Sequence, residues 1–193
     1  GKASLNRITE LMDAPVDVTD RDGVGNLENP KGSIEFRHLT FRYPDGDYNV
    51  LQDVSFQVAA GESVGIVGKT GAGKTTVVDL LLRTYNVPDG TLFVDGQDVN
   101  SVSIHSVRNA CAYVPQDNFL FSDTIAHNIG FGVDDATFDQ INGAASLADV
   151  RDNIVDFKEG YETILGERGV TVSGGQKQRI SIARAPVSYT HLT

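Results

Sequence analysis

Gly68-Lys-Thr-Gly-Ala-Gly-Lys74-Thr75-Thr76 completes the pattern G-x-x-x-x-G-K-[ST] directly after the apolar run Ser63-Val-Gly-Ile-Val67. Glycines in such a loop let the backbone bend tightly and turn several N–H groups toward phosphate oxygens. Lys74 adds a mobile positive charge for the β- and γ-phosphates, and Thr75 adds a hydroxyl ligand for Mg²⁺. The stretch predicts a nucleoside triphosphate site whose binding residues are Gly68, Thr70, Gly71, Gly73, Lys74, Thr75 and Thr76.

The residues on either side of this loop suit a phosphate site. Ser63–Val67 is expected to be a buried strand, and residues 75–85 are expected to follow as an apolar helix. The N-terminal end of a helix carries free N–H groups and a partial positive charge, and both favour an anion. The alternative interpretation is a glycine-rich turn that binds nothing, and this context argues against it.

Composition limits the classes of protein that remain. The 193 residues include 26 acidic and 16 basic side chains, which give a net charge of -10. Because no basic cluster could follow a phosphate backbone, nucleic-acid binding is disfavoured. Cys111 is the only cysteine, so an internal disulfide is excluded, and its apolar surroundings predict an inert buried thiol. No run approaches the ~18 consecutive apolar residues that would span a bilayer.

The first 32 residues differ in character from the rest. Residues 3–13 place Leu5, Ile8, Leu11 and Met12 at helical spacing, and residues 14–32, rich in Asp, Asn and Gly, are expected to form a linker. An isolated helix this short is marginal in water, so its apolar stripe needs a partner. That partner is either another domain or chain, or this same domain with the helix folded back onto it.

From residue 33 the pattern becomes that of strands. Residues 34–43 alternate apolar and polar side chains with an irregularity near His38, and Pro44–Gly46 forms a turn. Further strands are expected at residues 54–58, at 91–94 after the turn signal of Pro88–Gly90, and at 110–114. The pattern after Gln116 is mainly helical. These elements predict an α/β core to which a helical subdomain is attached.

A second motif lies far along the chain. Val172-Ser-Gly-Gly-Gln-Lys-Gln-Arg179 places Ser173, Gly174 and Gly175 where a helix would begin, so that a hydroxyl and free N–H groups again offer an anion site. The alternative is an ordinary N-cap serine followed by an ordinary glycine turn.

With both motifs in view, residues 33–185 resemble the nucleotide-binding domain of ATP-binding cassette (ABC) transporters, in which Ser-Gly-Gly-Gln is the signature. The resemblance implies an α/β fold with a P-loop NTPase core, an N-terminal antiparallel β subdomain and a helical signature subdomain. Tyr43 matches the aromatic residue that stacks on adenine. Gln116 matches the glutamine that reaches Mg²⁺ and the attacking water. ATP and Mg²⁺ are the implied ligands, with Thr75 and Gln116 on the metal and Gln116 and Lys74 in catalytic roles.

Other segments resemble the exporter type of this family. Residues 119–129 are similar to the segment where transmembrane coupling helices dock; the alternative is that Phe119, Leu120 and Phe121 belong to the local core. Gly166–Gly169 resembles a short exporter motif, and residues 1–13 resemble the cytoplasmic end of the last transmembrane helix. The resemblance implies a domain at the cytoplasmic face of the cell membrane, joined to transmembrane domains that export a substrate the sequence does not identify.

The family also implies a partner. Two such domains pair head to tail, as a homodimer or a heterodimer, with ATP held between the phosphate loop of one and the signature of the other. Ser173 and Gly175 are then expected to contact the γ-phosphate in trans, within a binding segment formed by Ser173, Gly174, Gly175 and Gln176. Closing and opening of this pair would move the transmembrane domains.

The sequence departs from the family after Ala185. The family continues with a helix, an apolar strand ending in Asp, a catalytic Glu and later a switch His, whereas residues 186–193 contain none of these motifs. Pro186 is unfavourable inside a continuing helix, and residues 186–193 are expected to be a non-native tail. With the C-terminal part of the core missing, we expect an unpaired apolar sheet edge, poor stability and little hydrolysis by this chain alone.

Three function classes remain at this stage. The first is the ATPase domain of an ABC exporter. The second is a soluble ABC-superfamily ATPase or a degenerate cassette that binds nucleotide without powering transport. The third is a P-loop kinase or another nucleotide-binding protein, against which the signature argues.

Overall fold

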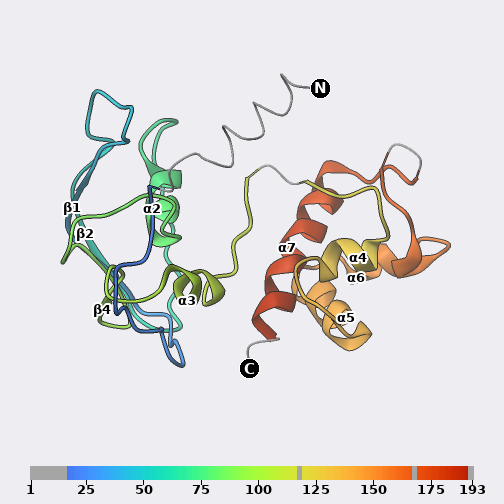
Figure 1. Ribbon diagram of the computed structural model, residues 1–193. Coiled ribbons are helices and arrows are strands. Elements are labelled where there is room, and N and C mark those ends of the chain that lie inside the picture. The colour runs from blue at the N-terminus through green and yellow to red at the C-terminus, as the bar shows by residue number, and fades with distance from the viewer. Residues whose placement is uncertain (1–16, 117–118, 167–168, 191–193) are drawn as a thin grey trace, which may run out of the picture. The chain divides into compact units, whose positions relative to one another are not determined.

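The computed structural model describes residues 17–116, 119–166 and 169–190, so the helix expected at residues 3–13 lies outside the described residues (Figure 1). The chain divides into two units, residues 1–110 and 111–193. The elements of the first unit are β1 (Ile34–Phe41), β2 (Leu51–Val58), α2 (Lys74–Leu81), β3 (Leu92–Val94), β4 (Gln97–Asp98) and α3 (Ile104–Asn109). Those of the second are α4 (Ile125–Gly130), α5 (Phe138–Leu147), α6 (Arg151–Val155), the 3-10 helix η1 (Gly160–Glu162) and α7 (Gly174–Thr190).

The sheet of the first unit is antiparallel throughout, with strand order β2-β1-β3-β4. Phe36 of β1 lies opposite Phe56 of β2, and their rings stack with centroids 4.6 Å apart. On its other side β1 pairs with β3, where Ile34 lies opposite Val94. The expected N-terminal antiparallel β subdomain is therefore confirmed.

The irregularity expected near His38 is also present. The register between β1 and β2 shifts between Phe36 and Leu39, and His38 has a φ of 45°. Its backbone N–H donates to Ser55 Oγ at 2.8 Å, which gives a side-chain partner to a donor that the bulge removes from the ladder. The bulge restores the phase of β1, so that both Phe36 and Leu39 are buried.

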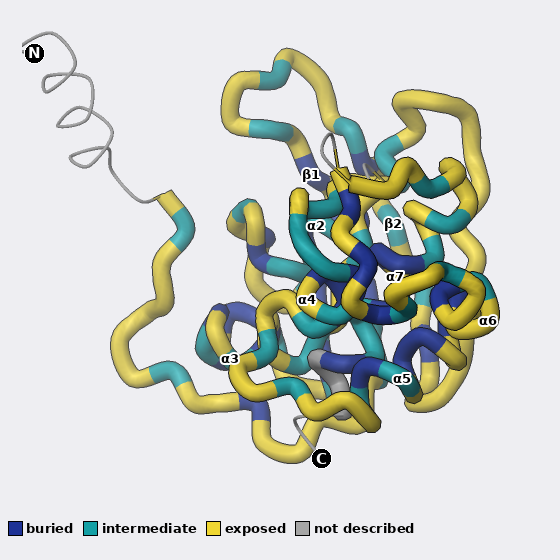
Figure 2. The backbone as a smooth tube through the Cα atoms, turned by 90° about the vertical axis from the view of Figure 1, so that its right-hand side faces the viewer, coloured by how far each residue is buried: buried dark blue, intermediate teal, exposed yellow. Residues whose placement is uncertain are grey.

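The cores of the two units are separate clusters of apolar side chains. In the first unit β1, β3 and α2 contribute fully buried residues, among them Leu39, Leu80 and Leu92. In the second unit Ile125 and Ile129 of α4 pack with residues of α5, η1 and α7. Figure 2 marks these buried stretches in dark blue, while most of the connecting loops are exposed. The mainly helical pattern expected after Gln116 is confirmed.

Helix α2 is shorter than the helix expected at residues 75–85. It ends at Leu81, after which Arg83 takes a φ of 53° and donates its N–H to the Leu80 carbonyl at 3.1 Å. Thr84 N–H donates to the Asp79 carbonyl at 2.9 Å, which completes a Schellman-type ending. This ending usually has glycine at the left-handed position. Arg83 occupies that position here because its buried guanidinium bonds to the Val99 carbonyl and its own carbonyl accepts from Arg108.

Two of the expected strands do not form. Residues 63–67 and 110–114 have no strand pairing among the described residues, and Val67 is 93% exposed. Val64, Ile66 and Tyr113 are exposed as well. A strand exists only with a neighbour to pair with, and the described residues supply none beside either run. The sequence pattern identified apolar segments correctly and assigned them the wrong structure.

Helix α7 continues beyond the point where Pro186 was expected to stop it. The helix includes Pro186 and ends at Thr190. Proline has no N–H to donate to the Ile182 carbonyl, but Ile182 is exposed, so water can satisfy that acceptor. In the next position Val187 is fully buried in the core of the second unit, which holds the last turns in place.

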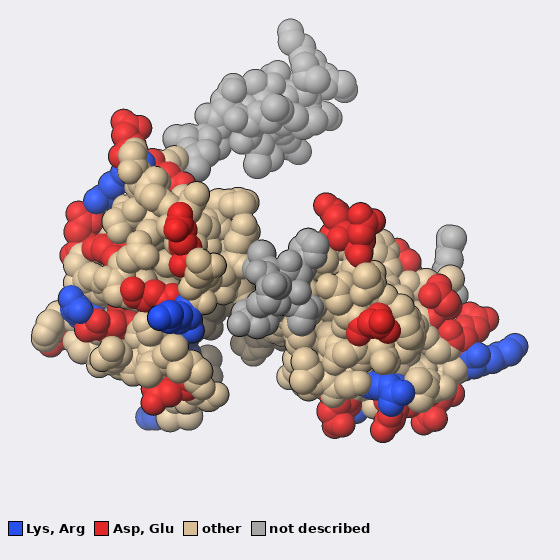
Figure 3. Space-filling view, turned by 90° about the horizontal axis from the view of Figure 1, so that it is seen from below, with Lys and Arg blue, Asp and Glu red and all other residues tan. Residues whose placement is uncertain are grey.

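Acidic side chains are spread over both units on the face drawn in Figure 3, and basic side chains are fewer there, in keeping with the net charge of -10. Among the helices that the structure describes, none has both the length and the apolar character needed to cross a bilayer.

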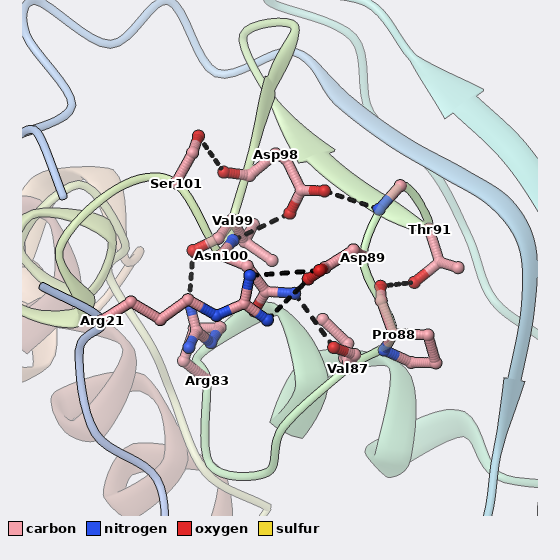
Figure 4. A network of polar contacts seen from close by, with 11 residues as sticks. Arg21, Arg83, Val87, Pro88, Asp89, Thr91, Asp98, Val99, Asn100 and Ser101 are labelled. Carbon is pink, nitrogen blue, oxygen red and sulfur yellow. Dashed lines mark hydrogen bonds and ion pairs between the residues drawn. The ribbon is translucent and has the colours of Figure 1, made fainter. Parts of the chain in front are cut away.

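Residues 17–32 are tied to the rest of the first unit by polar contacts. Arg21 forms a bidentate ion pair with Asp89, at 2.7 and 3.1 Å, and Asn100 donates to the same carboxylate at 2.7 Å (Figure 4). Hydrogen bonds from Arg21 and Asn100 hold the pKa of Asp89 below its usual range. The backbone N–H of Ile104 donates to Asp20 Oδ1 at 2.8 Å, so the same segment also caps the start of α3.

The turn between β3 and β4 fixes the start of β1 through Asp95. Its carboxylate accepts from the N–H groups of Lys31, Gly32 and Ser33 and from the Ser33 hydroxyl, at 2.7 to 3.3 Å. Burial raises the pKa of this carboxyl, but the hydrogen bonds from Ser33, Lys31 and Gly32 together lower it by more. The pKa of Asp95 therefore lies below the ordinary value of 3.8.

We predict that Asp95→Asn lowers the free energy of unfolding by about 1–2 kcal/mol at pH 7, because charge-assisted acceptors are lost. A lowered native pKa stabilises the fold above the unfolded value, and this contribution is lost as the pH falls through the native pKa. The difference between Asp95→Asn and the wild type should therefore shrink below pH ~3.8. Urea unfolding at pH 7 and pH 3, followed by circular dichroism, measures it; an equal difference at both values would contradict the prediction.

Candidate nucleotide-binding site

The phosphate loop, residues 68–76, is closed by its own lysine. Lys74 is the first residue of α2, and its Nζ donates to the carbonyls of Gly68 at 2.9 Å and Lys69 at 2.8 Å. Inside the loop, Ala72 N–H donates to the Lys69 carbonyl at 3.2 Å. An ammonium group has three donors, so a third N–H remains for a ligand. The lysine both shapes the loop and places a positive charge over it.

Gly73 is required by its conformation and by its surroundings. It is the N-cap of α2, with a φ of 82° that places it in the left-handed region. A Cβ built on it would lie 2.8 Å from Leu51 Cδ2 and 3.2 Å from the Val50 carbonyl oxygen. The start of α2 thus packs directly against the first residues of β2, at a distance that only glycine allows.

The two threonines that follow Lys74 point to different environments. Thr75 is exposed, whereas Thr76 is 3% exposed and faces the core of the unit. The first N–H groups of α2, on residues 74–76, have no intrahelical acceptor, since Val77 N–H is the one that donates to the Gly73 carbonyl. These N–H groups and the helix dipole make the end of α2 suitable for phosphate.

Tyr43 lies beside the phosphate loop. It follows the end of β1, in a turn closed by a hydrogen bond from Gly46 N–H to the Tyr43 carbonyl at 3.0 Å. Its ring meets Phe41 and Tyr85 at steep angles of 82° and 78°, with centroids about 5 Å away. Its hydroxyl lies 2.7 Å from Thr76 Oγ1. The structure therefore brings the aromatic residue and the phosphate loop of the predicted site together in one unit.

The signature segment lies in the second unit and begins α7. Ser173 Oγ accepts from Gln176 N–H at 3.2 Å, and Gln176 Oε1 accepts from Ser173 N–H at 2.9 Å. This reciprocal pair is a capping box. Ser173 is therefore the N-cap of α7, as the alternative interpretation of the motif expected. Gly174 and Gly175 are exposed, and a Cβ on either would meet no heavy atom within 4 Å. The segment is thus a capped helix start open to an anion.

The remaining predicted residues also lie in the second unit. Gln116 is exposed in a bend. Residues 167–168, inside the Gly166–Gly169 motif, lie outside the described residues, as does residue 117 next to Gln116. Phe119 is 63% exposed and meets Phe121 edge to face, with centroids 5.0 Å apart, while Phe121 packs on Phe131 at 4.3 Å. An aromatic surface formed by Phe119, Phe121 and Phe131 is therefore partly open to solvent.

A family model described as ABC transporter matches residues 51–193. The chain belongs to the ABC transporter family. It has the fold of an ABC nucleotide-binding domain, and the domains of this family bind ATP.

The relatives of this ABC domain are much longer than it is. It is 46% identical to the ATP-binding/permease protein YgaD of Bacillus subtilis (strain 168) over 94% of the chain and 31% of YgaD. It is 45% identical to ATP-binding cassette sub-family B member 6 of Mus musculus over 93% of the chain and 21% of that protein. The solved structure of a bacterial Atm1-family ABC exporter with ATP bound matches with a TM-score of 0.85 and 41% identity, over 96% of this chain and 32% of that one.

A hollow of about 400 Å³ in this ABC domain lies away from the phosphate loop. It is lined by Arg21, Asp22, Gly23, Val24, Asp89, Asp98, Asn100 and Ser101. Figure 4 shows the polar contacts around Arg21, Asp89, Asp98, Asn100 and Ser101. None of the residues predicted from the two motifs lines it. We therefore place the candidate site at the phosphate loop, on its chemistry, and not at this hollow.

Sequence reasoning missed several residues that position the site of this ABC domain. Tyr85, just past α2, packs edge to face on Tyr43, and Leu51 of β2 fits against Gly73. In the second unit Asn128 accepts from Arg184 of α7 at 3.0 Å and bonds to the backbone of Phe121. These residues belong to no sequence motif. The aromatic side chain of Tyr85 was the one feature that could have marked it as a neighbour of the site.

Proposed function

We propose that this chain is the ATP-binding domain of a membrane exporter and that it binds Mg·ATP with the phosphate loop and Tyr43. The observation that carries this proposal is the geometry of the first unit. The Lys74 ammonium lies over a loop whose helix presents free N–H groups, and Tyr43 is held against that helix by the Thr76 hydroxyl. A positive charge at the loop and an aromatic ring beside it suit the phosphates and the base of a nucleotide.

Each part of the loop has a defined task in this proposal. The Lys74 ammonium and the N–H groups at the start of α2 would hold the β- and γ-phosphates, since both are fixed donors. Tyr43 would offer its ring to the adenine. The Thr75 hydroxyl, exposed at the start of α2, would be a ligand for Mg²⁺. When bound, Mg²⁺ neutralises charge on the phosphates.

The signature would act on the nucleotide of a partner domain. Its exposed helix start, with free N–H groups on Gly174 and Gly175, suits a γ-phosphate that arrives from outside this chain. Ser173 would contribute its hydroxyl, which already accepts from Gln176 N–H and keeps its own O–H to donate. Both a homodimer and a heterodimer, paired head to tail, satisfy this arrangement.

The exporter part of the proposal rests on the relatives and on the aromatic surface of Phe119, Phe121 and Phe131. Exposed aromatic side chains gathered in one place favour docking of another protein surface. We assign this surface to the coupling helices of transmembrane domains, which places the domain at the cytoplasmic face of the membrane. Transport ATPase activity is then a property of the longer protein. The 193 residues contain no Asp-Glu pair after an apolar run, so we expect binding without appreciable hydrolysis from them alone.

Lys74→Ala tests the proposal. Removing a charged donor that faces the phosphates should weaken Mg·ATP binding about 30-fold, since a hydrogen bond to a charged group contributes about 2 kcal/mol. The matched control is Lys158→Ala, an exposed lysine of the second unit, which should bind ATP as the wild type does. Isothermal titration calorimetry with Mg·ATP measures all three proteins. Equal affinities in the two variants, or absence of binding by the wild type, would refute ATP binding at this loop.

A further inference from the structure

Three aromatic rings meet beside the phosphate loop. Phe41 ends β1, Tyr43 lies in the turn that follows it, and Tyr85 lies just past α2. The ring centroid of Tyr43 lies 5.1 Å from that of Phe41 and 5.0 Å from that of Tyr85, and the Phe41 and Tyr85 centroids are 5.7 Å apart. Each ring therefore contacts both of the others, although the three belong to different segments of the chain.

The hydrogen bond at the tip of Tyr43 cannot fix the plane of its ring. The Tyr43 hydroxyl lies 2.7 Å from Thr76 Oγ1. The Cβ, Cγ, Cζ and hydroxyl oxygen atoms of a tyrosine lie on one line, and this line is the axis of χ2. A contact at the hydroxyl therefore leaves the ring free to turn about it, and the intrinsic preference at χ2 is broad. The plane of the ring must be set by contacts at its sides.

Phe41 and Tyr85 supply these side contacts. Their ring planes meet that of Tyr43 at 82° and 78°. Edge-to-face pairs of aromatic rings have a preferred geometry, so these neighbours favour one plane for Tyr43 more strongly than aliphatic side chains would. Neither ring lies parallel to Tyr43, so neither is stacked on it in the way that a base would be.

Tyr85 is itself held in place on both sides along the chain. Before it, Arg83 ends α2 with a φ of 53°, and its carbonyl accepts from Arg108 at 3.0 Å. After it, the Asn86 side chain donates to the Asp17 carbonyl at 2.9 Å. The ring therefore sits on a segment that is fixed to distant residues at both ends, which makes it a rigid support for its neighbour.

We propose that Tyr85 is a positioning residue for recognition of the base: it fixes the plane of the Tyr43 ring and so prepares that ring to stack on the adenine. This inference rests on the proposed binding of ATP at the phosphate loop with Tyr43 on the base. A residue that acts through Tyr43 affects only ligands that carry a base, because a base-free polyphosphate does not use the ring. Tyr85 itself lies outside both sequence motifs.

The test compares ATP with inorganic tripolyphosphate, both with Mg²⁺, by isothermal titration calorimetry. Tyr85→Leu removes the ring and should weaken ATP about fivefold, because ordering Tyr43 then costs about as much free energy as one edge-to-face contact provides. Tyr85→Phe keeps the ring and should bind ATP within about twofold of the wild type. Tripolyphosphate should bind both variants within about twofold of the wild type, since it makes no use of Tyr43.

Two further substitutions make the test specific. Tyr43→Leu removes the stacking ring and should weaken ATP about tenfold. Adding Tyr85→Leu to it should change the affinity by less than about twofold, because the ring through which Tyr85 acts is gone. Tyr161→Leu is the matched control: Tyr161 of the second unit meets Phe138 edge to face, with centroids 5.2 Å apart. Its loss removes a similar contact and should leave the ratio of ATP to tripolyphosphate affinity unchanged.

The outcomes separate the inference from the function on which it rests. Selective loss of ATP affinity in Tyr85→Leu, with recovery in Tyr85→Phe, supports the inference. Equal weakening of both ligands by Tyr85→Leu, unchanged ATP affinity in that variant, or an undiminished further loss in the double variant would overturn it. If Tyr85→Leu does not fold, Tyr85→Met, which is also apolar and has no ring, decides by the same ratio. Failure of the proposed function is seen separately, as a wild type that binds neither ligand or a Tyr43→Leu variant that binds ATP as the wild type does.

Discussion

Gly73→Ala is expected to lower the free energy of unfolding by about 3 kcal/mol and to abolish nucleotide binding at the phosphate loop. A φ of 82° costs an L-residue about 1–2 kcal/mol. The added Cβ would also lie 2.8 Å from Leu51 Cδ2, and overpacking of this kind costs a further 1–3 kcal/mol. Leu51 is buried in the core, so it has little room to withdraw. Urea unfolding and titration with Mg·ATP measure the two effects.

Two other glycines separate the causes. Gly71 has the same φ of 82°, but a Cβ there meets nothing within 4 Å, so Gly71→Ala should cost about 1 kcal/mol through strain alone. Gly143 is exposed inside α5 and also meets nothing, so Gly143→Ala should stabilise by about 0.5–1 kcal/mol. If Gly73→Ala proved no more costly than Gly71→Ala, the close packing of α2 on β2 would not constrain position 73.

The features that the sequence predicted correctly are encoded locally. The β1–β2 pairing follows from the alternation of apolar and polar residues, and a shift of phase marks the bulge at His38. The turn at Pro44–Gly46 is likewise encoded by three adjacent residues. The Asp95-Gly96 turn between β3 and β4 is an equally local hairpin signal, and it was overlooked.

The features that were predicted wrongly depend on distant residues. Residues 63–67 read as a strand because they are apolar, but a strand needs a partner at its side, and composition cannot supply one. The residue at which α2 ends could not be predicted either, because Arg83 adopts a left-handed conformation that glycine usually takes. Its contacts to Val99 and Arg108, 16 and 25 residues away, make this possible.

The candidate site shows the same division. The choice of Lys74 and the glycines as candidates is predictable, because the motif fixes their spacing. The pairing of Tyr43 with Thr76 is not, because it depends on how the end of the β1–β2 hairpin meets α2, and 33 residues separate the two hydroxyls in sequence. Family resemblance could name Tyr43, but only the packing distinguishes Thr76 from Thr75.

Asn128→Ala is expected to destabilise the second unit by about 3 kcal/mol. Asn128 is 1% exposed, and its side-chain amide forms hydrogen bonds with the backbone of residues 121–124. Its Nδ2 donates to the carbonyls of Phe121, Asp123 and Thr124, while its Oδ1 accepts from Phe121 N–H at 2.8 Å and from Arg184 at 3.0 Å. Alanine would leave several of these groups buried without a partner, and each such group costs about 1–3 kcal/mol.

The loss should be local as well as global, because Asn128 joins the Phe121 segment to α7, the helix that begins at the signature. Hydrogen exchange at the Phe121 amide should accelerate strongly in Asn128→Ala, since that N–H donates to the amide oxygen that is removed. Asn153→Ala is the matched control in the same unit: Asn153 accepts a hydrogen bond from Arg179 at 3.1 Å, whereas the Phe121 amide bonds to Asn128, so the control should cost about 1 kcal/mol and leave that exchange unchanged. Unaltered protection of Phe121 in Asn128→Ala would mean that the aromatic surface is held by ring packing alone and that α7 is not coupled to it through this amide.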